Sequence, residues 1–175
     1  MWRLSPAGAR LAGLPPKRRN EPGRTRIDHV LDVAELVVRL HERSRHSDVD
    51  LLLVETEPRC WRRYLTSPGT TRWLKPDLAT TLGIGPIARH WFVEVDRDTE
   101  HRPHLHRKMS TYLAAWRNGG IQAALGVFPG VLWTAPTSTR RHALDEVIAD
   151  IGAPQAMFRA AGFDEAIDCL TGIAT

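Results

Sequence analysis

The chain has 175 residues, of which 42% are hydrophobic and 25% are charged. These values are ordinary for a globular protein and exclude wholesale disorder, and the length suits one domain with a small appendage. No apolar run approaches the roughly 18 residues that a membrane-spanning helix requires. Cys60 and Cys169 are isolated in the sequence, so neither a zinc site nor a disulfide framework is supported. We therefore expect a cytoplasmic protein with no membrane partner.

Charge is distributed unevenly along the chain, whose formal net charge is +4. Residues 1–26 contain seven Arg and Lys side chains against one acid, whereas residues 143–175 contain six acids against one Arg. A basic leading end predicts a polyanion partner, and we expect Arg18, Arg19 and Arg24 to contact DNA. From charge alone, a solvated arm explains the pattern about as well.

The first 26 residues predict an appendage and a linker. Residues 1–13 combine a helix N-cap, a first-turn proline and a C-cap glycine after a short strand-like run. This piece is similar to the wing and final turn of a winged-helix domain whose recognition helix would lie upstream of Met1. Either that unit is truncated or the fragment packs on the main domain. Prolines and a basic triplet mark residues 14–26 as a basic linker, which leaves residues 27–175 as the main domain.

The main domain alternates helix-like and strand-like segments. Asp28 is expected to cap a helix that runs to about His41, because apolar residues recur there at helical spacing. Residues 73–82 and 89–96 predict two strands joined around Gly83-Ile84-Gly85-Pro86. The other expected strands are Asp50–Glu55, Ala123–Phe128 and Val131–Thr134, and the other expected helices are Leu105–Trp116, Thr139–Ile151, Gln155–Ala161 and Asp164–Leu170. This order predicts a mixed α/β fold in which helices flank a central sheet.

Residues 58–69 follow no regular pattern and mix basic with aromatic side chains. Arg62 and Arg63 lie between Trp61 and Tyr64. Such interleaving can contact a nucleic-acid backbone or its bases, so we expect both arginines to contribute to DNA binding. A surface loop anchored by one aromatic side chain is at least as good an explanation.

Acidic residues in the apolar hairpin are the strongest functional signal. If the hairpin is symmetric about Gly85-Pro86, Asp77 lies directly opposite Glu94, and facing carboxylates on adjacent strands repel. A hard divalent cation such as Mg²⁺ or Mn²⁺ would reverse that repulsion, and Asp96 would share the face of Glu94 by the two-residue period of a strand. The alternative is that these acids pair with basic residues at a sheet end, namely Arg97, Arg89 or Lys75.

Pro76-Asp77, followed by a strand with Glu94-Val95-Asp96, resembles the core of restriction-endonuclease-like nucleases, whose signature is Pro-Asp, a spacer and then Asp/Glu-x-Lys. The resemblance implies that Asp77 and Glu94 hold a divalent metal. Asp96 stands where the signature has lysine, which leaves Asp96 as a further ligand or orienting group. Lys108 on the following helix could supply the ammonium instead, on one face with Tyr112. Glu35 matches the position of an additional acid.

A wider resemblance covers most of the chain. It is carried by Arg3-Leu4-Ser5-Pro6-Ala7-Gly8, Asp28-His29-Val30-Leu31, Lys75-Pro76-Asp77, the run Phe92 to Glu100, the Lys108–Tyr112 spacing and Gly126-Val127-Phe128-Pro129. Together these segments resemble the replication-relaxation family of actinobacterial plasmids and integrated mobile elements. That family implies a winged helix followed by a nuclease-like α/β domain that acts in DNA replication or processing. Asp98 stands where the family usually has glycine, in a turn where Asp is tolerated better than most residues.

These patterns leave three functions open. The first is a metal-dependent nuclease-like domain, with catalytic residues drawn from the acids and Lys108. The second is a non-catalytic DNA-binding or regulatory module, which the missing signature lysine favours. The third is a protein-interaction remnant. The sequence assigns no role to His29 or to the His101–His106 loop.

Overall fold

The computed structural model describes residues 24–66, 69–154 and 156–172. The expected wing at residues 1–13, most of the expected linker, and Arg18 and Arg19 lie outside the described residues. The backbone of Arg24 is described, but its side chain is not.

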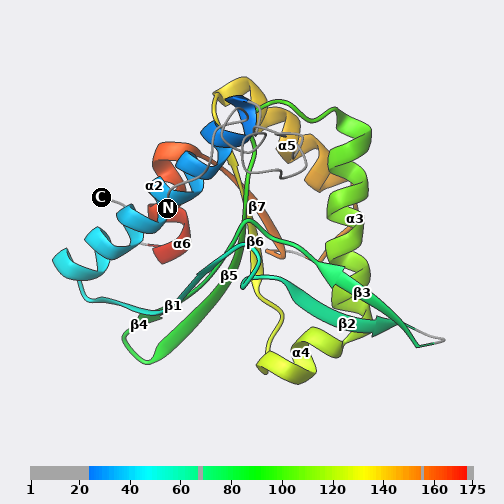
Figure 1. Cartoon of the computed structure of the whole chain (residues 1–175), viewed down its shortest axis with the longest axis horizontal. Helices are drawn as coiled ribbons and strands as arrows, with labels where there is room; N and C mark the ends of the chain where they lie inside the picture. Colours follow the sequence, from blue (N-terminus) through cyan, green and yellow to red (C-terminus); the bar gives the residue numbers. More distant parts are fainter. Residues whose placement is uncertain (1–23, 67–68, 155, 173–175) are drawn as a thin grey trace, which may run out of the picture.

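A five-stranded mixed sheet forms the centre of the molecule, in the order β1-β4-β5-β6-β7 (Figure 1). Its strands are β1 (Val49–Thr56), β4 (Leu78–Ile84), β5 (Ile87–Val95), β6 (Gly130–Ala135) and β7 (Phe158–Gly162). The first three pair in antiparallel fashion, and β5, β6 and β7 run parallel. The predicted mixed α/β fold with a helix-flanked central sheet is therefore confirmed.

Helices cover both faces of this sheet (Figure 1). One face carries α2 (Arg24–His46) and α6 (Ala166–Thr171), and the other carries α3 (Arg102–Asn118), α5 (Ser138–Asp150) and the short α4 (Gly120–Leu125). A short 3-10 turn, η1 (Phe163–Glu165), leads into α6. In the described residues, no helix has the length and apolar character needed to cross a membrane.

Strand alternation in β5 divides the interior into two cores. Phe92 points into the core under α3, where it packs near Tyr112 and Trp133, while its neighbour Val93 points into the core under α2. Because β5 is buried on both faces, a polar side chain near its end is removed from water by protein on both sides.

A separate two-stranded sheet projects beside α3 and α4 (Figure 1). It consists of β2 (Arg62–Thr66) and β3 (Thr70–Leu74). The prediction that residues 58–69 are irregular was therefore wrong for Arg62–Thr66, and so was the assignment of Trp73 to the first strand of the acidic hairpin. The side-chain amide of Asn118 at the end of α3 donates a hydrogen bond to the Leu65 carbonyl at 2.7 Å, which fixes the small sheet to the domain.

Several helix and strand assignments are corrected by the structure. Asp28 does not cap α2, which begins at Arg24 and extends to His46. The strand expected over Ala123–Phe128 does not form: Gly120–Leu125 is helix α4, which lies between the left-handed Gly119 and Gly126. Residues 158–162 form β7 rather than a helix, because their backbone pairs with β6.

The predicted register of the acidic hairpin is confirmed. Pairing runs from Leu78 opposite Val93 to Ile84 opposite Ile87, around a turn at Gly85-Pro86. The Asp77 N–H also donates to the Val93 carbonyl at 3.1 Å. Asp77 is thereby held next to the end of β5, on the side of the sheet that Glu94 faces.

Candidate functional site

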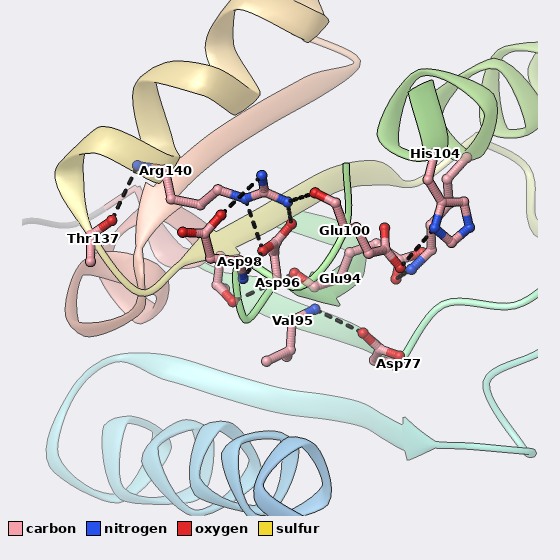
Figure 2. Close-up of polar contacts among 11 residues, drawn as sticks. Asp77, Glu94, Val95, Asp96, Asp98, Glu100, His104, Thr137 and Arg140 are labelled. Carbon is pink, nitrogen blue, oxygen red and sulfur yellow. Dashed lines mark hydrogen bonds and ion pairs between the residues drawn. The ribbon is translucent and has the colours of Figure 1, made fainter. Parts of the chain in front are cut away.

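The carboxylates of Asp77 and Glu94 are buried at neighbouring strand ends (Figure 2). Asp77 immediately precedes β4, and Glu94 is the next-to-last residue of β5. The Asp77 Oδ2 accepts a hydrogen bond from the Val95 N–H at 2.8 Å, so the carboxylate caps the end of the neighbouring strand. The hairpin register thus supplies the first half of the site.

Helix α3 supplies the second half through Lys108 and Tyr112, which lie one turn apart. The Lys108 Nζ lies 2.8 Å from the Glu94 Oε2, and the Tyr112 hydroxyl donates to the Glu94 Oε1. Glu94 itself is 1% exposed. Helical spacing predicted that Lys108 and Tyr112 share one face of this helix, and both side chains contact Glu94. The catalytic role expected of Lys108 stays a prediction.

Burial and the neighbouring charges have opposite effects on the pKa values of Glu94 and Lys108. Burial raises the pKa of Glu94 to about 8, although the charge of Lys108 opposes the rise. Burial alone would lower the pKa of Lys108, but the charges of Glu94 and Asp77 outweigh it and the pKa is raised. The pKa of Tyr112 is raised by its burial and by Glu94, so its hydroxyl stays protonated at neutral pH and acts as a hydrogen-bond donor.

His29 on α2 approaches Asp77 from the other side of the sheet end. Its Nε2 lies 3.1 Å from the Asp77 Oδ1, and the hydrogen bond raises the pKa of His29. Burial acts to raise the pKa of Asp77, but His29, the charge of Lys108 and the Val95 N–H together lower it. Asp77 is therefore ionised at neutral pH. His29, to which the sequence assigned no role, belongs to the site.

Asp96 is turned toward α5 instead of toward Glu94 (Figure 2). The Arg140 guanidinium donates through Nε to Oδ1 at 3.0 Å and through Nη2 to Oδ2 at 2.7 Å, a bidentate geometry. Arg140 also donates to the Glu100 carbonyl at 2.7 Å and pairs with Asp98 at 3.1 Å. The expected role of Asp96 as a further ligand has no support in this geometry, because both of its oxygens are occupied by Arg140.

A cavity of about 300 Å³ opens beside the site. Its walls include Glu94, Lys108 and His29 together with Glu100 and Trp133. Lys108 lies 5.2 Å from the centre of the Trp133 ring, a cation–π contact that adds to its positioning. The Glu100 Oε2 and the Trp133 Nε1 are buried polar atoms that make no hydrogen bond within the described part of the chain.

Other predicted site residues lie elsewhere. Glu35 is on the exposed surface of α2, paired with Arg39 at 2.9 Å, and does not line the cavity. Arg62 pairs with Glu55 at 2.7 Å, whereas Arg63 is exposed. Sequence reasoning missed Arg140, because a single arginine near the start of an amphipathic helix carries no signal that it is buried.

The two carboxylates fit a hard divalent cation in part. Mg²⁺ is commonly bound through one or two protein carboxylates, with water and substrate phosphates completing the shell. Over the described ranges, however, no three His, Cys, Asp or Glu side chains are grouped as metal ligands. Asp77 and Glu94 already contact His29 and Lys108, so an ion that bound both acids would have to displace one of these contacts.

A comparison with known protein families shows to which family the chain belongs. The sequence model of the family described as replication-relaxation matches residues 1–131. The chain belongs to the replication-relaxation family. The replication-relaxation match includes Asp77, Glu94 and Lys108, while Arg140 and the whole of α5 lie beyond it. The family name associates the chain with replication and DNA processing. A search of curated proteins found no match.

Proposed function

We propose that this replication-relaxation protein is a nuclease-like domain that processes DNA during the replication of a plasmid or mobile element. The observation that carries the proposal is the convergence of Asp77, Glu94 and Lys108 at one sheet end, beside a cavity. Two acids on consecutive strands and a lysine on the next helix are the groups that a restriction-endonuclease-like core requires, with the lysine moved from the strand to the helix.

Each side chain has a separate task in this proposal. Asp77, ionised and fixed by the Val95 N–H, and Glu94, oriented by Tyr112, would hold Mg²⁺ or Mn²⁺. A bound ion would supply Lewis-acid polarisation of the scissile phosphate. The Lys108 ammonium attracts the phosphate into the cavity and offsets charge that develops on its oxygens. Asp96 acts as a positioning residue, because its pair with Arg140 fixes the chain directly after β5.

Metal-dependent cleavage of supercoiled plasmid DNA tests this function. We expect nicking in Mg²⁺ or Mn²⁺ that falls at least about 100-fold in Asp77→Asn and Glu94→Gln, because either change removes a carboxylate that would bind the metal. Glu42→Gln on the exposed surface of α2 is the matched control and should cut like the wild type. Nicking that persists unchanged in both site variants would refute the assignment.

A second function is favoured by the ion pairs of the site. Three buried carboxylates of the site each contact a basic side chain: Asp77 contacts His29, Glu94 contacts Lys108, and Asp96 contacts Arg140. A nuclease-derived module that binds DNA without cutting it would have this internally neutralised arrangement. It predicts salt-sensitive DNA binding with no turnover in any divalent metal. In that case the two acid variants lose folding stability, and their binding per folded molecule stays at the wild-type level.

A further inference from the structure

One face of the β2–β3 hairpin combines aromatic and basic side chains that the domain does not cover. In the antiparallel register Arg63 is opposite Trp73, and Leu65 is opposite Thr71. Strand alternation places these four residues on one face, while Tyr64 and Leu74 point into the domain core. Trp73 is 51% exposed and Leu65 is 60% exposed. We refer to Arg63, Trp73 and the adjoining Lys75 as the hairpin face.

Lys75 extends the hairpin face toward the base of the hairpin. Its Nζ lies 4.4 Å from the centre of the Trp61 ring, a cation–π contact that orders the ammonium at the surface. Residues 58–76 contain five basic side chains and no acid. Arg62 is neutralised by Glu55, but within the described residues no carboxylate pairs with Arg63 or Lys75. The hairpin face therefore presents net positive charge next to a solvent-facing indole.

This combination selects a particular class of ligand. Exposing half of a tryptophan to water is unfavourable unless a partner covers it. Unpaired bases stack on such rings, and neighbouring cations bind the phosphates that link the bases. The bases of a duplex are already stacked and present only their edges in the grooves, so an indole on a flat hairpin gains little from a duplex.

We propose that the hairpin face binds single-stranded or locally unpaired DNA, with a base stacked on Trp73 and phosphates held by Arg63 and Lys75. This inference rests on the proposed DNA-processing function and specifies the form of DNA that reaches the site. Lys75 is two residues before Asp77, so their Cα atoms lie within about 7 Å of each other. A DNA strand bound on the hairpin face would therefore pass close to Asp77 and Glu94.

The hairpin is anchored well enough to act as a preformed platform. Asn118 binds the Leu65 carbonyl from the end of α3, and the Cys60 Sγ–H donates to the Pro76 carbonyl at 2.9 Å. Tyr64 is buried in the main core. Because the face is fixed before binding, little conformational entropy is lost when a strand docks.

Fluorescence anisotropy with the whole chain, in EDTA and at low salt, tests the inference. The probes are labelled oligothymidylate and the oligothymidylate–oligoadenylate duplex of the same length. We expect tighter binding to the single strand and a loss of about 5- to 100-fold in Trp73→Ala, which removes one stacked base. Trp73→Phe should retain most of the affinity, and Arg63→Ala should weaken binding and reduce its salt dependence. Arg45→Ala, an exposed arginine at the end of α2, is the matched control and should bind as the wild type does.

The possible outcomes separate this inference from the proposed function. Thermal unfolding shows whether each variant is folded, and quenching of Trp73 fluorescence by oligothymidylate, seen as the difference between wild type and Trp73→Phe, reports stacking directly. Wild-type affinity in Trp73→Ala, or equal losses for single strand and duplex, would overturn the inference while DNA binding itself stands. Absence of binding to either probe would overturn the inference and the proposed function together.

Discussion

At the scale of single residues, His29 and Asp77 form a pair whose stabilising effect depends on pH. The pair raises the pKa of His29 and lowers that of Asp77. The contribution of His29 is fully present below the unfolded histidine pKa of about 6.5 and is lost as pH rises through the folded value. The contribution of Asp77 is present above about pH 4 and is lost as pH falls through its folded value. The pair is therefore most stabilising between these limits.

Replacing His29 should remove this pH dependence. We expect the difference in unfolding free energy between wild type and His29→Gln, measured with urea, to be larger at about pH 6 than at about pH 8.5, by up to about 1 kcal/mol for this partly exposed pair. His41→Gln, an exposed histidine of the same helix, serves as the control. A difference that grows as the pH is raised would contradict the assigned ion pair.

The sequence was informative about residues whose neighbours are local. The short loop at Gly85-Pro86 fixed the register, and the register placed Asp77 beside the end of β5. Helical spacing placed Lys108 and Tyr112 on one face of α3. The contacts of His29 with Asp77 and of Arg140 with Asp96 join segments 48 and 44 residues apart. No periodic pattern in one sequence encodes such contacts, because they arise only when the sheet and both helix layers are assembled.

At the scale of elements, Arg140 joins α5 to the end of β5. Its guanidinium is held by both oxygens of Asp96, by Asp98 and by the Glu100 carbonyl, so the turn after β5 is built around one side chain. The backbone of Asp98 has φ of 58°, a left-handed conformation that this turn requires. The helix layer and the strand end are therefore one cooperative unit.

Arg140→Met should destabilise the protein by about 3–5 kcal/mol, because it leaves the Asp96 carboxylate buried without a charged partner. The neighbouring Arg141 is a matched control, since its pair with Glu165 is exposed. Arg141→Met should cost less than about 1 kcal/mol. Urea unfolding of the two variants measures the free energy of unfolding. Equal losses in the two variants would show that the buried Arg140–Asp96 pair contributes no more than the exposed Arg141–Glu165 pair.

Element types were predicted well where propensity and tertiary pairing agree. The apolar stripe of α2 and the Gly119 stop after α3 are examples. Residues 158–162 contain three small residues and no β-branched side chain, so local preference favours helix. Pairing with β6 overrides that preference, and β7 becomes a strand. The hairpin of β2 and β3 was missed because Arg62–Thr66 and Thr70–Leu74 are short and show no clear two-residue alternation of polar and apolar side chains.

At the scale of the whole molecule, the part that matches the family is smaller than the folding unit. The match ends at residue 131, just inside β6, but β6 needs β7 as its outer neighbour and α5 as cover. Trp133, fully buried, lies beyond the match as well. The core under α3 cannot close without the last quarter of the chain.

A chain ended after residue 131 should therefore fail to fold. We expect it to show no cooperative thermal transition, because the central sheet loses β7 and most of β6, and the hydrophobic layer around Leu144 and Val147 is lost with them. Circular dichroism during heating is the measurement, with the 175-residue chain as reference. A sharp transition in the shortened chain would show instead that the family-matched part is autonomous.

The burial of Glu94 also bears on how this site changes over evolutionary time. Lys108 and Tyr112 both bind the Glu94 side chain, so a mutation at Glu94 alone would strand an ammonium and a hydroxyl within the protein. The Lys108 side chain is 30% exposed, so we expect a loss below the roughly 3–5 kcal/mol of a fully buried pair, but still a substantial share of the about 5–15 kcal/mol by which a typical domain is folded. Selection for folding alone is therefore enough to keep the glutamate and the lysine in descendants, with or without nuclease activity. In related sequences, we expect Glu94 and Lys108 to be kept or lost together. Their presence in a relative would indicate that the core is intact, and would not by itself indicate nuclease activity.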